Sequence, residues 1–336
     1  MLTSDLDYEL PEALIAQAPA EPRDSSRLMV VDAARGTIEH RTFHELPLFL
    51  RPGDGLVLNE TKVLPARLKT RKTTGGEVEL LFLRDLGPGR GNAWEVLARP
   101  ARRLKPGGTL LAGDAKIELV ENLGEGRWSV AAPDVVGLLE RHGRMPLPPY
   151  IEATPEAEAR YQTVYAREPG SAAAPTAGFH FTEDVLEGAE RAGADVTRVT
   201  LHVGTGTFLP VRTERLEDHQ MHAERYSVPA EAARVVRGAE RVIAAGTTVA
   251  RTLETWSGTG EGSGESRLFV YPGYRWQAVD ALLTNFHLPR STLLAMVMSF
   301  GGRDLVREAY LTAVEERYRF YSFGDAMLIL NGGRTL

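Results

Sequence analysis

The chain has 336 residues, 43% hydrophobic and 25% charged, a composition typical of a soluble globular protein, and its length predicts two domains. It contains no cysteine, which excludes disulfides, thiolate nucleophiles, cysteine-ligated zinc and iron–sulfur clusters. The formal net charge is −6, yet residues 60–105 hold 11 basic and 5 acidic side chains. Such a basic segment suggests a polyanionic partner, although charge alone is better explained by a solvated mixed surface.

The first 62 residues predict mixed helix and strand. Residues 10–16 indicate a short helix with Pro11 in its first turn, and the apolar runs 28–31 and 56–58 predict strands. Residues 1–7 lack the basic start and apolar run of a signal peptide, and no run approaches ~18 uninterrupted apolar residues. We therefore expect a cytoplasmic protein without a membrane span.

From about residue 64 the pattern changes to short strands separated by glycine turns. Short strands at regular spacing with such turns are typical of a small barrel. The predicted strands are 64–70, 77–83, 93–98, 109–112, 116–121 and 127–131. This all-β block lies between α/β segments, so it predicts an inserted six-stranded β-barrel domain over residues 63–149.

The remainder returns to alternating strands and helices. Thr182 and Ser291 are predicted helix caps, and 198–203, 242–245 and 278–283 are predicted strands. Residues 155–174, around Tyr161 and Tyr165, are expected to be mobile or partly ordered, and the Gly/Ser-rich run 259–266 is expected to be a flexible loop. We predict an α/β fold with a mostly parallel sheet flanked by helices, built from residues 1–62 and 150–336.

Three polar loops in the second half indicate where a ligand binds. They span 175–182, 245–248 and 284–291, and each leads into a predicted helix start. The run 201–208 adds a strand that ends in a glycine loop. Loops of this kind gather at the carboxyl edge of a parallel sheet, where helix N-termini attract polar or anionic ligands. Gly204 and Gly206 alone do not make a dinucleotide motif, because Leu209 stands where a third glycine is required.

Histidines beside these loops are candidates for proton transfer near neutral pH. His180, His202, His222 and His287 all lie in or next to them. A metal site at His219, His222 and Glu224 is the weaker alternative, because no H-E-x-x-H or similar cluster is present. All five lysines lie between residues 62 and 116, which excludes a Schiff base or pyridoxal phosphate in the second half.

Sequence strings along nearly the whole chain resemble one family, the S-adenosylmethionine:tRNA ribosyltransferase-isomerases of queuosine synthesis. They are Asp5-Leu-Asp-Tyr-Glu-Leu-Pro11, Ser26-Arg-Leu28, Leu58-Asn-Glu-Thr-Lys-Val63, Pro65-Ala-Arg67, Pro175-Thr-Ala-Gly-Phe-His-Phe-Thr182, Leu201-His-Val-Gly-Thr-Gly-Thr-Phe208, Met221-His222, Gly246-Thr-Thr248, Arg251-Thr-Leu-Glu254, Tyr271-Pro-Gly-Tyr274, Asp280-Ala-Leu-Leu-Thr-Asn-Phe-His-Leu-Pro289 and Phe323-Gly-Asp-Ala-Met-Leu328.

The resemblance implies transfer and isomerisation of the ribosyl unit of S-adenosylmethionine onto 7-aminomethyl-7-deazaguanine at the wobble position of a tRNA. The products are epoxyqueuosine-tRNA, adenine and methionine. S-adenosylmethionine is then a consumed substrate, and we expect no cofactor and no metal. The family fold is an α/β domain with an inserted barrel, and we expect a monomer.

The resemblance and the loop positions together assign candidate site residues. The candidate catalytic residues are His180, His202, His287 and Glu224. The candidate substrate-binding residues are Thr176, Gly178, Thr182, Gly204, Gly206, Thr207, Gly246, Thr247, Thr248, Arg251 and Asn285. The candidate tRNA-binding residues are Lys62, Arg67, Lys69, Arg71 and Lys72. Two alternatives stay open: an S-adenosylmethionine-dependent RNA methyltransferase and a non-catalytic RNA-binding protein.

Overall fold

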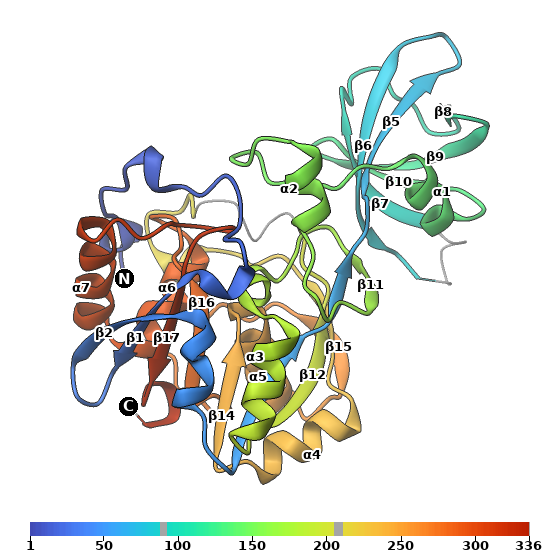
Figure 1. Ribbon diagram of the computed structural model, residues 1–336. Coiled ribbons are helices and arrows are strands. Elements are labelled where there is room, and N and C mark those ends of the chain that lie inside the picture. Colours follow the sequence, from blue (N-terminus) through green and yellow to red (C-terminus); the bar gives the residue numbers. More distant parts are fainter. Residues whose placement is uncertain (88–92, 205–210, 336) are drawn as a thin grey trace.

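The computed structural model describes residues 1–87, 93–204 and 211–335. It consists of a larger body of sheet and helices, which holds both chain termini, and a barrel that projects from one side of it (Figure 1). Within the described residues, no helix combines the length and the apolar character needed to cross a membrane.

The larger body is built on a nine-stranded sheet with the order β15-β13-β12-β3-β14-β16-β17-β1-β2. In that order the strands are Ser263–Ser266, Glu224–Ser227, Asp195–Leu201, Asp54–Asn59, Arg241–Ala245, Ala281–Asn285, Ala326–Leu330, Arg27–Asp32 and Thr37–Thr42. The central strands β12, β3, β14 and β16 are parallel, as are β17 and β1, and the remaining pairs are antiparallel. The α/β class is therefore confirmed, with a mixed sheet whose parallel centre is the part that positions the loops.

Helices cover both faces of this sheet. Helices α4 (Ala230–Gly238), α5 (Thr247–Thr259), α6 (Thr292–Gly301) and α7 (Arg303–Glu315) bury their apolar sides against one face. Helix α3 (Glu183–Arg191) and the 3-10 helix η4 (Phe43–Phe49) pack on the other. Successive strand residues point to opposite faces, so Leu282 belongs to the first core and Leu283 to the second.

The projecting body is a closed antiparallel barrel with the strand order β10-β7-β6-β5-β8-β9. In chain order, β5 to β10 are Arg67–Lys72, Glu77–Asp85, Ala93–Arg99, Thr109–Ala112, Ala115–Gly124 and Arg127–Ala131. Its inward side chains form a separate core, to which helix α1 (Val135–His142) adds Val135, Leu138 and Leu139. The predicted six-stranded barrel is confirmed, because glycine turns and alternation mark its strands in the sequence.

Two short parallel strands lie where the chain passes between the bodies. Strand β4 (Thr61–Val63) leads from β3 toward the barrel, and β11 (Glu168–Ser171) pairs with it on the return. All barrel strands and α1 fall inside the predicted inserted segment 63–149. The ion pair between Arg84 of β6 and Glu265 of β15 also bridges the two bodies, with a 3.2 Å separation of Nη1 and Oε1.

Residues 155–174 are more ordered than predicted, and the prediction of a flexible loop at 259–266 is wrong. Residues 155–174 form helix α2 (Pro155–Arg160) and strand β11, and Tyr161 and Tyr165 are both buried. Residues 259–266 complete α5 and form the edge strand β15, which pairs with β13. Both segments are ordered by partners distant in sequence, which their composition does not reveal.

Candidate active site

The ends of the parallel strands are tied together by one amide side chain. Asn59, the last residue of β3, accepts from the Leu201 N–H and donates to the Leu201 carbonyl, both at 3.0 Å. Its amide nitrogen also lies 3.2 Å from the Thr248 hydroxyl in the first turn of α5. The ends of β3 and β12 and the start of α5 therefore meet at a single point, which brings the predicted loops 201–208 and 245–248 together.

The loop containing residues 175–178 closes over the same edge. Thr176 donates to Asn285 Oδ1 at 3.2 Å, and a side chain at Gly246 would lie 3.5 Å from the Ala177 methyl. Gly246 has φ of +107°, a conformation that glycine adopts without strain, and its N–H donates to the Leu283 carbonyl at 2.7 Å. Three of the predicted loops are thus brought together.

His180 is buried within this arrangement and both of its ring nitrogens have partners. Nδ1 lies 2.7 Å from the Ser26 hydroxyl, and Nε2 lies 3.1 Å from the Asn285 amide nitrogen. The ring stacks on Phe43 at 5.0 Å. Burial lowers the pKa of His180 to about 4, an effect that Asp325 opposes, so the ring is neutral at pH 7. His180 is therefore placed to orient Asn285.

His202 follows β12 and is only half-buried. Its Nδ1 lies 2.9 Å from the hydroxyl of Thr61, and that hydroxyl lies 2.7 Å from the hydroxyl of Ser171. Burial, with help from the positive charge of Arg225, lowers the pKa of His202 and favours a neutral imidazole. Nε2 has no hydrogen bond to any described residue.

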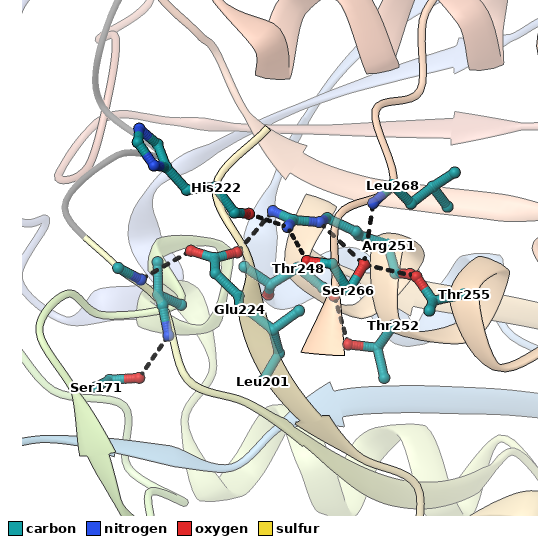
Figure 2. Close-up of polar contacts among 12 residues, drawn as sticks. Ser171, Leu201, His222, Glu224, Thr248, Arg251, Thr252, Thr255, Ser266 and Leu268 are labelled. Carbon is teal, nitrogen blue, oxygen red and sulfur yellow. Dashed lines mark hydrogen bonds and ion pairs between the residues drawn. The ribbon is translucent and has the colours of Figure 1, made fainter. Parts of the chain in front are cut away.

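Glu224 and Arg251 form a buried ion pair in which Oε2 and Nη1 are 2.6 Å apart. Figure 2 shows the guanidinium of Arg251 between Glu224 and Ser266, where it also donates to the carbonyls of His222 and Ser266 at 2.9 and 2.8 Å. The other oxygen of Glu224 accepts from the Gly204 N–H at 2.7 Å. Burial lowers the pKa of Arg251, which Glu224 opposes. The pair therefore fastens α5 to the loop after β12.

A pocket lies beside this ion pair, at the N-terminal turns of α5 and α6. It is lined mainly by apolar side chains, with hydroxyls and the ion pair at its margin. The lining residues are Met221, Glu224, Thr247, Thr248, Arg251, Leu268, Phe269, Val270, Thr292, Leu293 and Met296. Apolar walls beside two helix N-termini suit a ligand with a flat or aliphatic part and an anionic group.

His287 lies apart from His180. Its Nε2 is 2.8 Å from the Thr284 hydroxyl, whereas His180 contacts Asn285, the next residue of β16. Neighbouring strand residues point to opposite faces, so the two rings lie on opposite sides of the sheet. Burial lowers the pKa of His287 to about 3. The structure therefore does not group all three histidines.

Two other predicted substrate-binding residues, Thr182 and Gly178, make structural contacts. Thr182 caps α3 by accepting from the Val185 N–H at 3.3 Å, and it donates to Asp24. Gly178 is packed against Tyr165, whose hydroxyl would lie 2.2 Å from an added side-chain carbon. Gly206 and Thr207 lie outside the described residues. In the described part of the chain, no group of three or more acidic or histidine side chains is placed to hold a metal ion.

Sequence reasoning gave no role to Asn59, Thr61 and Ser171, although all three hold the site together. The available signal for Asn59 and Thr61 was the polar string 59–62, which directly follows the strand predicted at 56–58. Its contacts with residues 171 and 202 could not be read from spacing along the chain.

The predicted tRNA-binding residues lie on β4 and β5. Arg67 and Arg71 form ion pairs with Glu79 and Glu77 of β6, at 2.7 and 3.4 Å. Lys62 and Lys69 are exposed, and Lys72 is half-buried. None of these three lysines is ion-paired with a described residue. The surface of β5 therefore combines paired arginines with free lysines.

The described fold and site define an α/β protein with a polar ligand site at the carboxyl edge of its parallel strands and an inserted barrel. The family model described as "Queuosine biosynthesis protein" matches residues 3–329. A protein from Rubrobacter xylanophilus named S-adenosylmethionine:tRNA ribosyltransferase-isomerase is 70% identical over 100% of both chains. One of the same name from Symbiobacterium thermophilum is 52% identical over 98% of this chain and 100% of the other.

A solved structure shows the same relationship. The crystal structure of S-adenosylmethionine tRNA ribosyltransferase from Thermotoga maritima is 39% identical and matches with a TM-score of 0.56, covering 97% of this chain and 100% of that chain. The chain belongs to the queuosine biosynthesis protein family, which confirms the resemblance noted in its sequence.

Proposed function

We propose that this protein transfers and isomerises the ribosyl moiety of S-adenosylmethionine onto 7-aminomethyl-7-deazaguanine at the wobble position of tRNA, giving epoxyqueuosine-tRNA, adenine and methionine. The observation that carries the proposal is the 70% identity, over the full length of both chains, to a relative named for this activity. The edge site and the pocket beside it support an enzyme over a purely RNA-binding protein. A monomer acting in the cytoplasm is part of the proposal.

The pocket between α5 and α6 is the proposed place for S-adenosylmethionine. Its apolar side chains suit the adenine ring or the methionine side chain, and the helix N-termini suit the carboxylate. The sulfonium acidifies the neighbouring C5′ protons of the ribose, and adenine must then depart. His202 is the imidazole best placed to contact substrate, because it is half-buried and no described residue makes a hydrogen bond to its Nε2.

The contacts of His180 and Glu224 favour positioning roles. His180 is held between Ser26 and Asn285, and Glu224 between Arg251 and Gly204. His287 sits on the opposite face of β16 and supports the loop that follows this strand. Direct catalytic roles for these three residues stay predictions from the sequence.

Identifying the products tests the proposed reaction. We expect adenine and methionine to form from S-adenosylmethionine only when the tRNA carries the deazaguanine amine. The same tRNA with an unmodified guanine at the wobble position is the matched control and should yield neither. S-adenosylhomocysteine as the product would instead identify a methyltransferase.

We further propose that the barrel contacts the tRNA backbone. Replacing Lys69, Arg71 and Lys72 together with glutamine is expected to weaken tRNA binding and flatten its salt dependence. Each lost phosphate contact should lower the slope of log K against log salt by about 0.7–0.9. Arg71 is paired with Glu77, so the two lysines should account for most of the change. Affinity for S-adenosylmethionine alone should not change.

The matched control replaces Arg303, Arg307 and Arg317 with glutamine, an equal loss of charge at exposed positions of α7 and the turn after it. Helix α7 lies on the side of the larger body away from the barrel (Figure 1). tRNA titrations at several salt concentrations compare the two triple variants. Equal slopes for the barrel variant and the wild type would contradict a backbone contact at β5.

A further inference from the structure

Two buried hydroxyls lie where the chain crosses between the two bodies. Thr61 is the first residue of β4 and Ser171 the last residue of β11, and their exposed fractions are 0% and 1%. Their oxygens are 2.7 Å apart. At this distance one of the two hydroxyls donates its hydrogen to the other, and the surrounding donors and acceptors indicate which one.

The imidazole of His202 rests on this hydroxyl pair. Its Nδ1 is 2.9 Å from Thr61, and its own backbone N–H donates to the Arg225 carbonyl at 2.9 Å. The ring also lies directly against Gly170, where an added side-chain carbon would be 2.7 Å from Cε1 and 2.8 Å from Nδ1. Gly170 has φ of +148°, within the region that favours glycine. The Thr61 hydroxyl and the backbone at Gly170 therefore hold the imidazole ring from two sides.

The neighbouring donors and acceptors favour one direction for the chain of hydrogen bonds. The Val203 N–H donates to Ser171 at 2.8 Å, so Ser171 uses an acceptor site there. In the described part of the chain, the acceptor within reach of the Ser171 hydrogen is Thr61. Thr61 must then direct its own hydrogen either to His202 Nδ1 at 2.9 Å or to the Glu168 carbonyl at 3.5 Å. The shorter contact is strongly preferred.

We propose that Thr61, supported by Ser171, is a positioning residue that holds His202 as the tautomer with its hydrogen on Nε2. His202 then presents an N–H donor to the substrate, not a lone pair. The effect of this tautomer on catalysis rests on the proposed function. A neutral imidazole N–H can stabilise negative charge that develops on a substrate atom, such as a ring nitrogen of the departing adenine.

The tautomer can be read directly from the folded protein without substrates. Histidine ring nitrogens labelled with ¹⁵N distinguish the two tautomers in long-range ¹H–¹⁵N spectra, and a His202→Ala spectrum assigns the His202 signals. We expect wild type and Thr61→Ser, which keeps the hydroxyl, to show the hydrogen on Nε2. Thr61→Val keeps the shape but removes the donor, so a mixture or the Nδ1 tautomer is expected.

Steady-state kinetics provide the second readout. Thr61→Val should lower kcat by roughly tenfold or more, since loss of one hydrogen-bond donor to developing negative charge typically costs about 10²–10³-fold. KM for S-adenosylmethionine should change little, and Thr61→Ser should restore kcat. Thr70→Val is the matched control, because it removes another buried hydroxyl, which donates to the Val78 carbonyl inside the barrel. It should leave the His202 tautomer unchanged.

Three results would overturn the inference: a hydrogen on Nδ1 in wild type, an unchanged tautomer in Thr61→Val whatever its turnover, or wild-type kcat in that variant. If Thr61→Val does not fold, the wild-type and Thr61→Ser spectra still decide the tautomer. Failure of the wild type to release adenine would contradict the proposed function and leave the spectra intact. The proposed function and the inferred tautomer of His202 can therefore be refuted independently.

Discussion

His202→Ala is expected to lower turnover by roughly 10²-fold or more, the usual loss when a proton-transfer or charge-stabilising group is removed. Of the three histidines predicted to be catalytic, His202 alone is half-buried with a ring nitrogen that no described residue occupies. The measurement is single-turnover formation of ribosylated tRNA. His202→Gln, which retains an N–H near the position of Nε2, should keep more activity than His202→Ala.

His44→Ala is the matched control, because His44 is exposed on η4 and should leave turnover unchanged. Thermal unfolding of each variant checks that the fold is intact. Near-normal turnover in a folded His202→Ala protein would return His202 to a purely structural role.

Arg251→Met is expected to lower the free energy of unfolding by about 3–5 kcal/mol, because it removes the cation from a buried ion pair. The exposed fractions of Arg251 and Glu224 are 5% and 6%, and Arg251 also satisfies the carbonyls of His222 and Ser266. Glu224, which accepts from the Gly204 N–H at the candidate site, would lose the partner that holds it, so activity should fall as well. Urea unfolding measures the first effect.

Two further variants separate charge from size. Arg234→Met makes the same exchange at an exposed position of α4 and should change stability little. Arg251→Met combined with Glu224→Leu removes both charges and should be less destabilised than Arg251→Met alone. If Arg251→Met lowers the free energy of unfolding by less than about 1 kcal/mol, the expectation is contradicted, and Glu224 must be stabilised by solvent or by another residue.

The fold could be predicted wherever local pattern decides it. The barrel strands agree with their predicted positions to within about three residues, because inward residues such as Leu68, Val78 and Leu80 alternate between glycine turns. Thr182 and Ser291 cap their helices as expected. Strand β15 could not be predicted because it is ordered by pairing with β13, which lies far from it in sequence. The burial of Tyr161 could not be predicted because it results from packing against Phe179 and Phe323.

The candidate site was predictable as a set of loops and less so as a set of contacts. The meeting of residues 246 and 285 follows from the parallel pairing of β14 and β16, whereas residue 176 reaches them from η6. The Thr61–Ser171–His202 chain joins three separate segments, and no period or spacing connects them. The ion pairs of Arg67 and Arg71 depend on the β5–β6 register, which composition leaves open.

The fate of the two halves of S-adenosylmethionine tests the central claim most directly. The protein is incubated with the modified tRNA and S-adenosylmethionine that carries one label in the ribose and another in the methyl group. The account predicts that the ribose label enters the tRNA while the methyl label leaves in free methionine. A methyl label in the tRNA, with S-adenosylhomocysteine as the other product, would contradict it.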